Sequence, residues 1–164
     1  TTNATNDSIT INSTASGGGG SSTFAGTTDA TAAGLNVAEI YMPAIVMLTV
    51  TNNSASSYRF TSHYGSTDNP TIYAISGTTI AFNLQGVGSS HPFQIQDSGG
   101  SSYDTGLVHV TTTGTVTTGS SANARTGGVL YWQIPQGISG NYKYQCTSHG
   151  GMNGTINIKQ ISTI

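Results

Sequence analysis

Short runs of β-branched and aromatic residues, separated by glycine, asparagine, serine and proline, fill the chain from about residue 36 onward. Their spacing is typical of strands in a β-sandwich or barrel, and no segment has the apolar period of an amphipathic helix. We therefore expect an all-β fold. The predicted strands are 45–51, 57–62, 71–75, 78–84, 92–96, 106–117 (one strand or two), 128–134, 140–146 and 154–160.

Alternation within two of these runs predicts which side chains face the core. Successive side chains of a strand point to opposite faces of a sheet, so every second residue shares a face. The apolar members of 78–84 and 140–146 are expected to point inward: Ile80, Phe82, Leu84, Tyr142, Tyr144 and Cys146. The apolar faces of two sheets would then meet in one core.

The first 40 residues have a different composition. They contain a tetraglycine at 17–20, many serines and threonines, and only scattered apolar residues. A segment of this kind buries too little apolar surface to order itself. We divide the chain into an extended arm, residues 1–40, and one β-domain, residues 41–164. The arm is expected to lie on a neighbouring subunit or another partner.

The scarcity of charge excludes several classes of partner. Charged residues make up only 6% of the chain, and its formal net charge is -2. Four lysines and arginines provide no basic surface for phosphates, so we expect no nucleic-acid partner. The longest apolar run, 44–50, is too short to span a bilayer, and no membrane association is expected. The single cysteine excludes an intrachain disulfide.

That cysteine lies in a group of candidate metal ligands near the C-terminus. Cys146 is followed by His149 and then by Met152, each three residues further on. Thiolate, imidazole and thioether select copper, and a Cys and two His with a weak axial Met form an electron-transfer copper site. His91 can supply the second imidazole, because it lies in a loop between two predicted strands. We expect these four side chains to converge.

Structural roles are the alternative interpretation. Taken singly, a buried cysteine is usually a small apolar side chain. Gly150, Gly151 and Gly154 weaken that interpretation, because they pack poorly but suit a tight turn. The alternative to a metal site is a degenerate copy of the fold that binds no metal. His63 and His109 are expected to be structural or exposed. No carboxylate pair, nucleophile elbow or phosphate loop stands out, so we expect no enzyme.

The motif Y-x-Y-x-C-x-x-H-x-x-M-x-G, from Tyr142 to Gly154, resembles the ligand loop of the cupredoxins, the small blue copper proteins. Its spacing is more similar to that of amicyanin than to the longer loop of plastocyanin. The resemblance covers about residues 44–160 and implies a Greek-key β-sandwich, with the extended N-terminal arm outside it. It also implies one bound copper ion, with the ligands His91, Cys146, His149 and Met152.

One residue departs from the cupredoxin pattern. These proteins usually have an asparagine after the first histidine ligand, and its backbone N–H donates to the thiolate. Here the residue is Pro92, which has no N–H to donate. More electron density then stays on the sulfur, which favours Cu(II) and lowers the reduction potential, unless another loop amide such as that of Gly150 compensates.

Several segments also resemble cupredoxin-like domains in structural proteins of marine bacteriophages, especially those infecting cyanobacteria. They include TVTNNSASSYRF, SHPFQIQDSGG and YWQIPQGISGNYKYQCTSHGGMNGTINI. This resemblance implies a virion structural protein, a capsid decoration or fibre component exposed at the virion surface. Other virion proteins would contact residues 1–40, and the chain would be a homo-oligomer or lattice-bound. The alternative is a small soluble blue-copper electron-transfer protein of the periplasm or thylakoid lumen.

Overall fold

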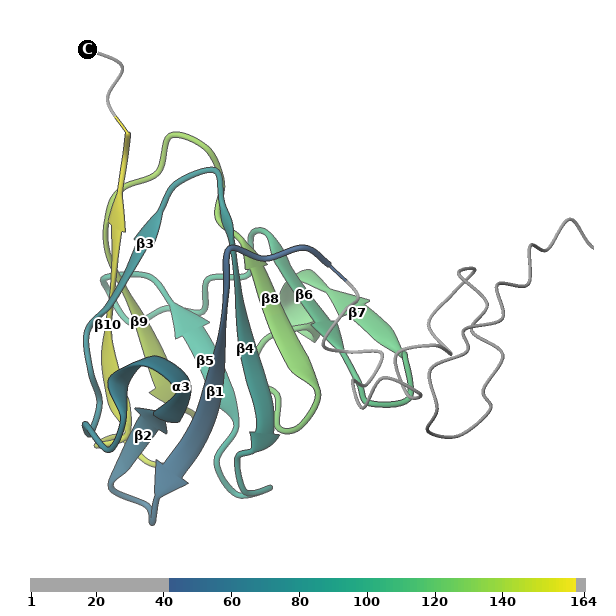
Figure 1. Cartoon of the computed structure of the whole chain (residues 1–164), viewed down its shortest axis with the longest axis vertical. Helices are drawn as coiled ribbons and strands as arrows, with labels where there is room; N and C mark the ends of the chain where they lie inside the picture. Colours follow the sequence, from purple (N-terminus) through teal and green to yellow (C-terminus); the bar gives the residue numbers. More distant parts are fainter. Residues whose placement is uncertain (1–41, 162–164) are drawn as a thin grey trace, which may run out of the picture.

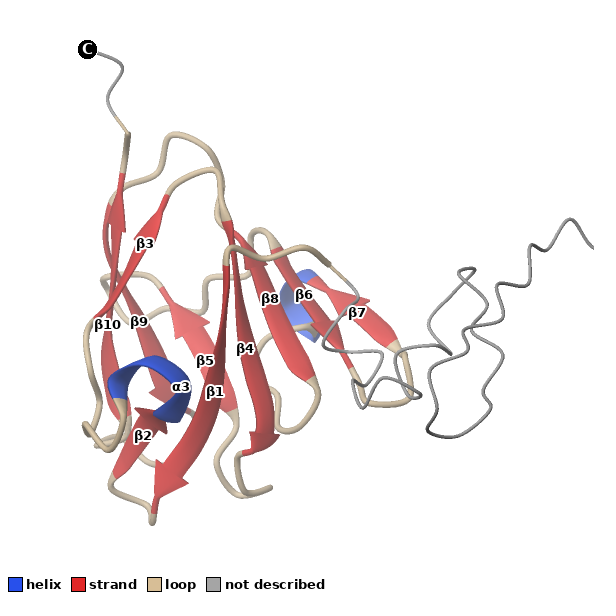
Figure 2. Cartoon of the chain, in the orientation of Figure 1, coloured by secondary structure: helices blue, strands red, loops and turns tan. Residues whose placement is uncertain are grey.

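The computed structural model describes residues 42–161, which form two β-sheets that enclose one core (Figure 1). The strands of the larger sheet are β1 (Val46–Asn53), β2 (Ser57–Phe60), β4 (Thr79–Gly86), β6 (Leu107–Val110), β7 (Val116–Thr118) and β8 (Val129–Gln133). The strands of the smaller sheet are β3 (Ile72–Ile75), β5 (Phe93–Gln96), β9 (Gly140–Cys146) and β10 (Asn153–Lys159). Figure 2 shows that strands dominate this part of the chain.

The strand orders are β2-β1-β4-β8-β6-β7 in the six-stranded sheet and β3-β10-β9-β5 in the four-stranded sheet. Both sheets are mixed, because β1 runs parallel to β4 and β3 runs parallel to β10, whereas the other neighbours are antiparallel. The parallel pairs mean that the chain crosses between the sheets rather than forming hairpins alone. The predicted all-β sandwich is confirmed.

Each predicted run overlaps an observed strand, and the run 106–117 covers two, β6 and most of β7. The extension of one strand to residue 62 was wrong. After β2 the chain forms a one-turn helix, α3 (Thr61–Tyr64), and a 3-10 turn, η1 (Gly119–Ser121), follows β7. The Thr49 N–H of β1 donates to Ser62 Oγ of this helix at 3.0 Å. A side chain therefore supplies the hydrogen bond that a longer β2 would have made.

The core lies between the two sheets and is rich in aromatic side chains. Of the residues predicted to point inward, Tyr142 is partly buried and the others are buried in this core. Five aromatic rings pack edge to face or stacked in its centre, with centroids 5.0–6.3 Å apart: Tyr58, Phe60, Phe82, Phe93 and Tyr144. Burial of each such side chain contributes about 1.5–3 kcal/mol, which makes this cluster a rigid base for the loops above it.

The N-terminal arm predicted for residues 1–40 lies outside the described residues, and so does its boundary at residue 41. Among residues 42–161, no helix has the length and apolar character needed to cross a bilayer. The Thr-rich stretch 110–124 contains β7, which is an edge strand with two exposed residues of three.

Candidate metal centre

Two neighbouring strands of the four-stranded sheet bring the predicted ligands to one end of the sandwich. β9 ends at Cys146, and the turn between β9 and β10 carries His149. β5 lies beside β9 with Phe93 directly opposite Cys146. His91 lies two residues before Phe93, so the strand register places the loop of His91 next to the cysteine.

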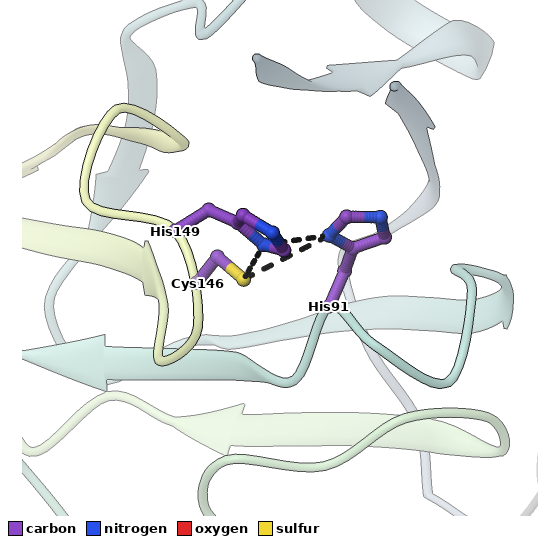
Figure 3. Close-up of side chains that lie close together, drawn as sticks. All are labelled: His91, Cys146 and His149. Atoms are coloured by element: carbon purple, nitrogen blue, oxygen red, sulfur yellow. Dashed lines mark hydrogen bonds between the residues drawn. The ribbon is translucent and has the colours of Figure 1, made fainter. Parts of the chain in front are cut away.

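The two imidazole rings and the sulfur point toward one another (Figure 3). Nδ1 of His91 lies 3.1 Å from Nδ1 of His149. Sγ of Cys146 lies 3.5 Å from Nδ1 of His149 and 4.0 Å from Nδ1 of His91. The three ligand atoms all lie within 4.8 Å of one another, and no other trio of His, Cys, Asp or Glu in residues 42–161 has this arrangement.

The triangle of ligand atoms has the size of a small metal site. Imidazole nitrogen and thiolate sulfur bind a metal such as zinc at about 2.0–2.3 Å, so three such ligands around a central ion lie about 3.5–3.8 Å apart. The observed separations of 3.1, 3.5 and 4.0 Å bracket this range. Cys146 is 2% exposed and His91 8%, while His149 is half-buried. Together with Met152 nearby, these residues fit the ligand set of a type 1 copper ion.

Hydrogen bonds fold the ligand loop into a tight turn. The Cys146 N–H donates to the Met152 carbonyl at 2.9 Å, and the Met152 N–H donates to the His149 carbonyl at 3.1 Å. The Gln145 side-chain amide donates to the Cys146 and His149 carbonyls at 2.8 and 3.0 Å. These bonds hold the thiol and one imidazole in position within the loop itself, which lowers the cost of ordering the ligands when a metal binds.

Met152 is the predicted fourth ligand and the last residue of this turn. Its side chain is fully buried and belongs to the core cluster between the sheets. The hydrogen bonds of the turn join its backbone to both Cys146 and His149. A buried thioether beside a thiol and an imidazole suits a weak axial ligand, and this role stays a prediction.

Two residues without any sequence motif support the site. The fully buried Tyr58 donates its hydroxyl hydrogen to the His91 carbonyl at 2.8 Å. Burial raises the pKa of Tyr58 far above its usual value, and the adjacent Cys146 raises it further. Asn69 accepts a hydrogen bond from the Tyr58 N–H at 2.9 Å and donates to the Gly151 carbonyl at 3.1 Å. No sequence pattern indicated a role for either residue, and the only signal for Tyr58 was its place in a predicted strand.

Pro92 follows His91 and joins the two ligand loops through its carbonyl, which accepts a hydrogen bond from the Thr147 N–H at 3.2 Å. Within the described part of the chain, no backbone N–H donates to the sulfur of Cys146. The donor that proline removes is therefore not replaced by another amide of these loops.

The remaining two histidines lie away from this centre. His63 is exposed on α3, with Nδ1 3.1 Å from Ser62 Oγ. His109 on β6 is buried, and its Nε2 donates to the Gly127 carbonyl at 2.8 Å. His63 is thus exposed and His109 structural, as predicted.

His109 is expected to make the fold less stable in mild acid. Burial lowers its pKa below the ordinary 6.5 and the charge of Arg125 lowers it further, although the hydrogen bond to Gly127 opposes them. Between the lowered pKa and about 6.5, the unfolded chain binds more protons than the folded chain. The free energy of unfolding therefore falls as the pH drops below about 6.5, by at most about 1.4 kcal/mol per pH unit for this group.

Urea unfolding of the metal-free protein at about pH 7.5 and about pH 5.5 measures this effect. His109→Gln keeps a donor for the Gly127 carbonyl and removes the titrating group, so its free energy of unfolding should change less between the two conditions. The other histidines contribute equally to the pH dependence of the wild type and the variant, so the difference between the two proteins reports on His109. An equal change in the two proteins would show that His109 does not contribute.

No protein-family model matches the chain, and no curated protein matches it. Similar solved structures include amicyanin from Paracoccus versutus, with 17% identity, a TM-score of 0.40, and coverage of 74% of this chain and 88% of that one. A mutant of amicyanin in its reduced Cu(I) form has 11% identity, a TM-score of 0.40, and coverage of 74% and 89%. A mutant of rusticyanin has 16% identity, a TM-score of 0.41, and coverage of 71% and 80%.

Amicyanin and rusticyanin are cupredoxins, the family that the sequence resembles. The fold and the site together define this chain as a two-sheet β-sandwich with a His-Cys-His cluster at one end.

Proposed function

We propose that this chain is a blue-copper protein, which holds one copper ion through His91, Cys146 and His149 with Met152 as the axial ligand. One observation carries the proposal: the two Nδ1 atoms and Sγ form a triangle with sides of 3.1, 3.5 and 4.0 Å. Nitrogen and sulfur ligands of this number favour copper over the hard cations magnesium and calcium, which prefer oxygen.

Electron transfer is the function that this site supports best. A bound copper ion would supply a one-electron Cu(I)/Cu(II) couple, and residues held firmly around it would need to rearrange little between the two states. Here β9 ends at Cys146, His91 lies two residues before the paired strand β5, and the Tyr58 hydroxyl donates to the His91 carbonyl. His149 is half-buried, while Cys146 is buried. The His149 ring would therefore be the path for electrons between the site and a redox partner at the surface.

Titration of the purified, metal-free chain with Cu(II) tests this proposal. We expect one ion to bind per chain and an intense visible absorption from thiolate-to-copper charge transfer. Zinc should compete for the same site without colour, because Zn²⁺ has no redox chemistry and a filled d shell. A chain that stays colourless with copper would contradict the blue-copper assignment and leave the fold as a scaffold.

Pro92→Ala is expected to raise the reduction potential of the copper-loaded protein. The alanine N–H can donate to the Cys146 sulfur, which draws electron density from the thiolate and favours Cu(I). A hydrogen bond worth about 1 kcal/mol corresponds to roughly 40 mV for a one-electron couple. Pro135→Ala is the matched control, because Pro135 lies before β9, at the far end of that strand from Cys146. Equal potentials for the Pro92 variant and the wild type would show that this N–H does not reach the sulfur.

A second candidate function is a structural module of a bacteriophage particle, exposed at the virion surface. It is supported by the sequence segments that resemble such proteins and by the charge content of 6%, which offers little steering toward a soluble redox partner. In this setting residues 1–40 contact other virion proteins, and the chain is a homo-oligomer or part of a lattice. The blue-copper carrier would instead belong in the periplasm or thylakoid lumen.

A density map of the assembled particle distinguishes the two functions. The structural role predicts that residues 1–40 bury more than about 1,000 Å² against other chains. A monomer whose arm contacts no other chain would exclude the structural role and leave the carrier.

A further inference from the structure

The six-stranded sheet is apolar on both faces. Its outward face carries a second cluster, separate from the core between the sheets, which we name the outer cluster: Ala81, Val108, Val110, Val129 and Tyr131. Its members are 0–9% exposed, and Tyr131 has no exposed surface. An antiparallel or mixed sheet in a sandwich usually turns a polar face to water, so this face needs an explanation.

The strand register joins the outer cluster into continuous rows across the sheet. Met47 of β1 lies beside Ala81 of β4, which pairs with Tyr131 of β8, which pairs with Val108 of β6. These strands lie side by side in one layer (Figure 1). A second row runs from Val129 through Val110 to the edge-strand residue Val116. The apolar face therefore extends over most of the sheet's width.

Side chains on the outward face of a sheet are buried only if another layer of the protein packs on them. Such a layer lies about 10 Å from the sheet. Among the described residues, the partly buried apolar side chains that pack on the outer cluster are Met42, Ala44 and Met47. Met42 and Ala44 lie just before β1, and Met42 is the first described residue. The Ile45 N–H donates to the Thr79 carbonyl at 2.9 Å, which fixes this entering segment against β4. The chain thus reaches the outer face at the point where the described residues begin.

We infer that residues 35–41, LNVAEIY, dock on the outer cluster of their own chain and complete its cover. Five of these seven residues are apolar, whereas the 34 before them are rich in serine, threonine and glycine. Seven extended residues span about 23 Å. The three strands β4, β8 and β6 span only about 10 Å between the outer two. The segment is long enough to cross the whole cluster.

The chain's own segment is favoured over that of a second copy by its attachment. A short tether gives the segment an effective concentration on the order of millimolar at the face that Met42 already contacts. A second copy would have to displace it at a lower concentration. The β-domain would then begin near residue 35, and only residues 1–34 would be left to contact other proteins.

The full chain offers a matched pair of substitutions to test this inference. Ile40→Asp places a charge in the docked segment, whereas Ile9→Asp makes the same change outside it. We expect Ile40→Asp to lower the Tm by about 5–10 °C and Ile9→Asp to leave it unchanged. Ile40→Ala should lower the Tm by a smaller amount and gives the comparison if the aspartate variant does not fold.

The dependence of the Tm on protein concentration distinguishes docking of the chain's own segment from docking of a second copy. Docking within one chain predicts that the Tm and the effect of Ile40→Asp are the same over a hundredfold range of concentration. A Tm that rises with concentration would identify a second copy as the occupant and overturn the inference. Equal Tm values for the wild type, Ile40→Asp and Ile40→Ala would show that residues 35–41 do not cover the face. None of these variants touches the copper ligands, so copper binding reports separately on the proposed function.

Discussion

Cys146→Ser is expected to abolish the intense visible absorption of the copper-loaded protein completely. That absorption needs a thiolate bound to copper, and a serine hydroxyl stays protonated and binds copper weakly. The side chain is nearly the same size and sits at a position that is 2% exposed. The fold should therefore persist, and the loss of colour would report on the ligand itself. Absorption spectra of wild type and variant at equal copper loading measure the effect.

The histidines provide the controls for this experiment. His91→Ala should weaken copper binding strongly, because it removes one corner of the ligand triangle. His63→Ala removes an exposed imidazole on α3 and should leave the colour and the affinity unchanged. A Cys146→Ser protein that kept the wild-type spectrum would place the copper elsewhere in the chain and refute the proposed site.

Gly154→Ala is expected to destabilise the domain by about 3 kcal/mol. Gly154 of β10 lies opposite Tyr144 of β9. A Cβ atom at this position would lie 2.9 Å from Cε1 of Tyr144 and closer still to its Cζ and Oη. The ring cannot move aside easily, because it is fully buried, stacks on Phe93 and donates to the Pro70 carbonyl at 2.6 Å. Urea or thermal unfolding of the metal-free protein measures the loss.

Gly150→Ala, in the turn just before β10, is the matched control. A Cβ atom on Gly150 meets no other atom within 4 Å. We expect this variant to change the free energy of unfolding by less than about 0.5 kcal/mol. If Gly154→Ala were as stable as Gly150→Ala, the Tyr144 ring would have room that the structure does not show.

Local patterns in the sequence were enough to predict most strands. The alternation of 78–84 and 140–146 placed six side chains on inward faces, five of which are buried and one partly buried. The helix α3 could not be predicted, because its four residues have no capping side chain and none of them is buried. It forms where Ser62 can accept the Thr49 N–H, and that contact depends on β1 lying alongside.

The candidate site, like the fold, could be predicted from the sequence only in part. The types and spacing of Cys146, His149 and Met152 are visible along the chain, and they indicate copper chemistry without any structure. The part played by Tyr58 is not visible, because an inward tyrosine in a strand is usually only a core residue. Its hydroxyl meets the His91 carbonyl only after β2 and the loop before β5 have come together.

By itself, the sequence determined the all-β class, the strand positions and the soft ligand set, because side-chain alternation and ligand chemistry are local properties of the chain. The tertiary structure decided that the loop of His91 meets the turn after Cys146, and that the six-stranded sheet is apolar on its outer face as well. Both depend on which strands pair and in which register. That choice is made by packing between residues far apart in the chain, which no local pattern records.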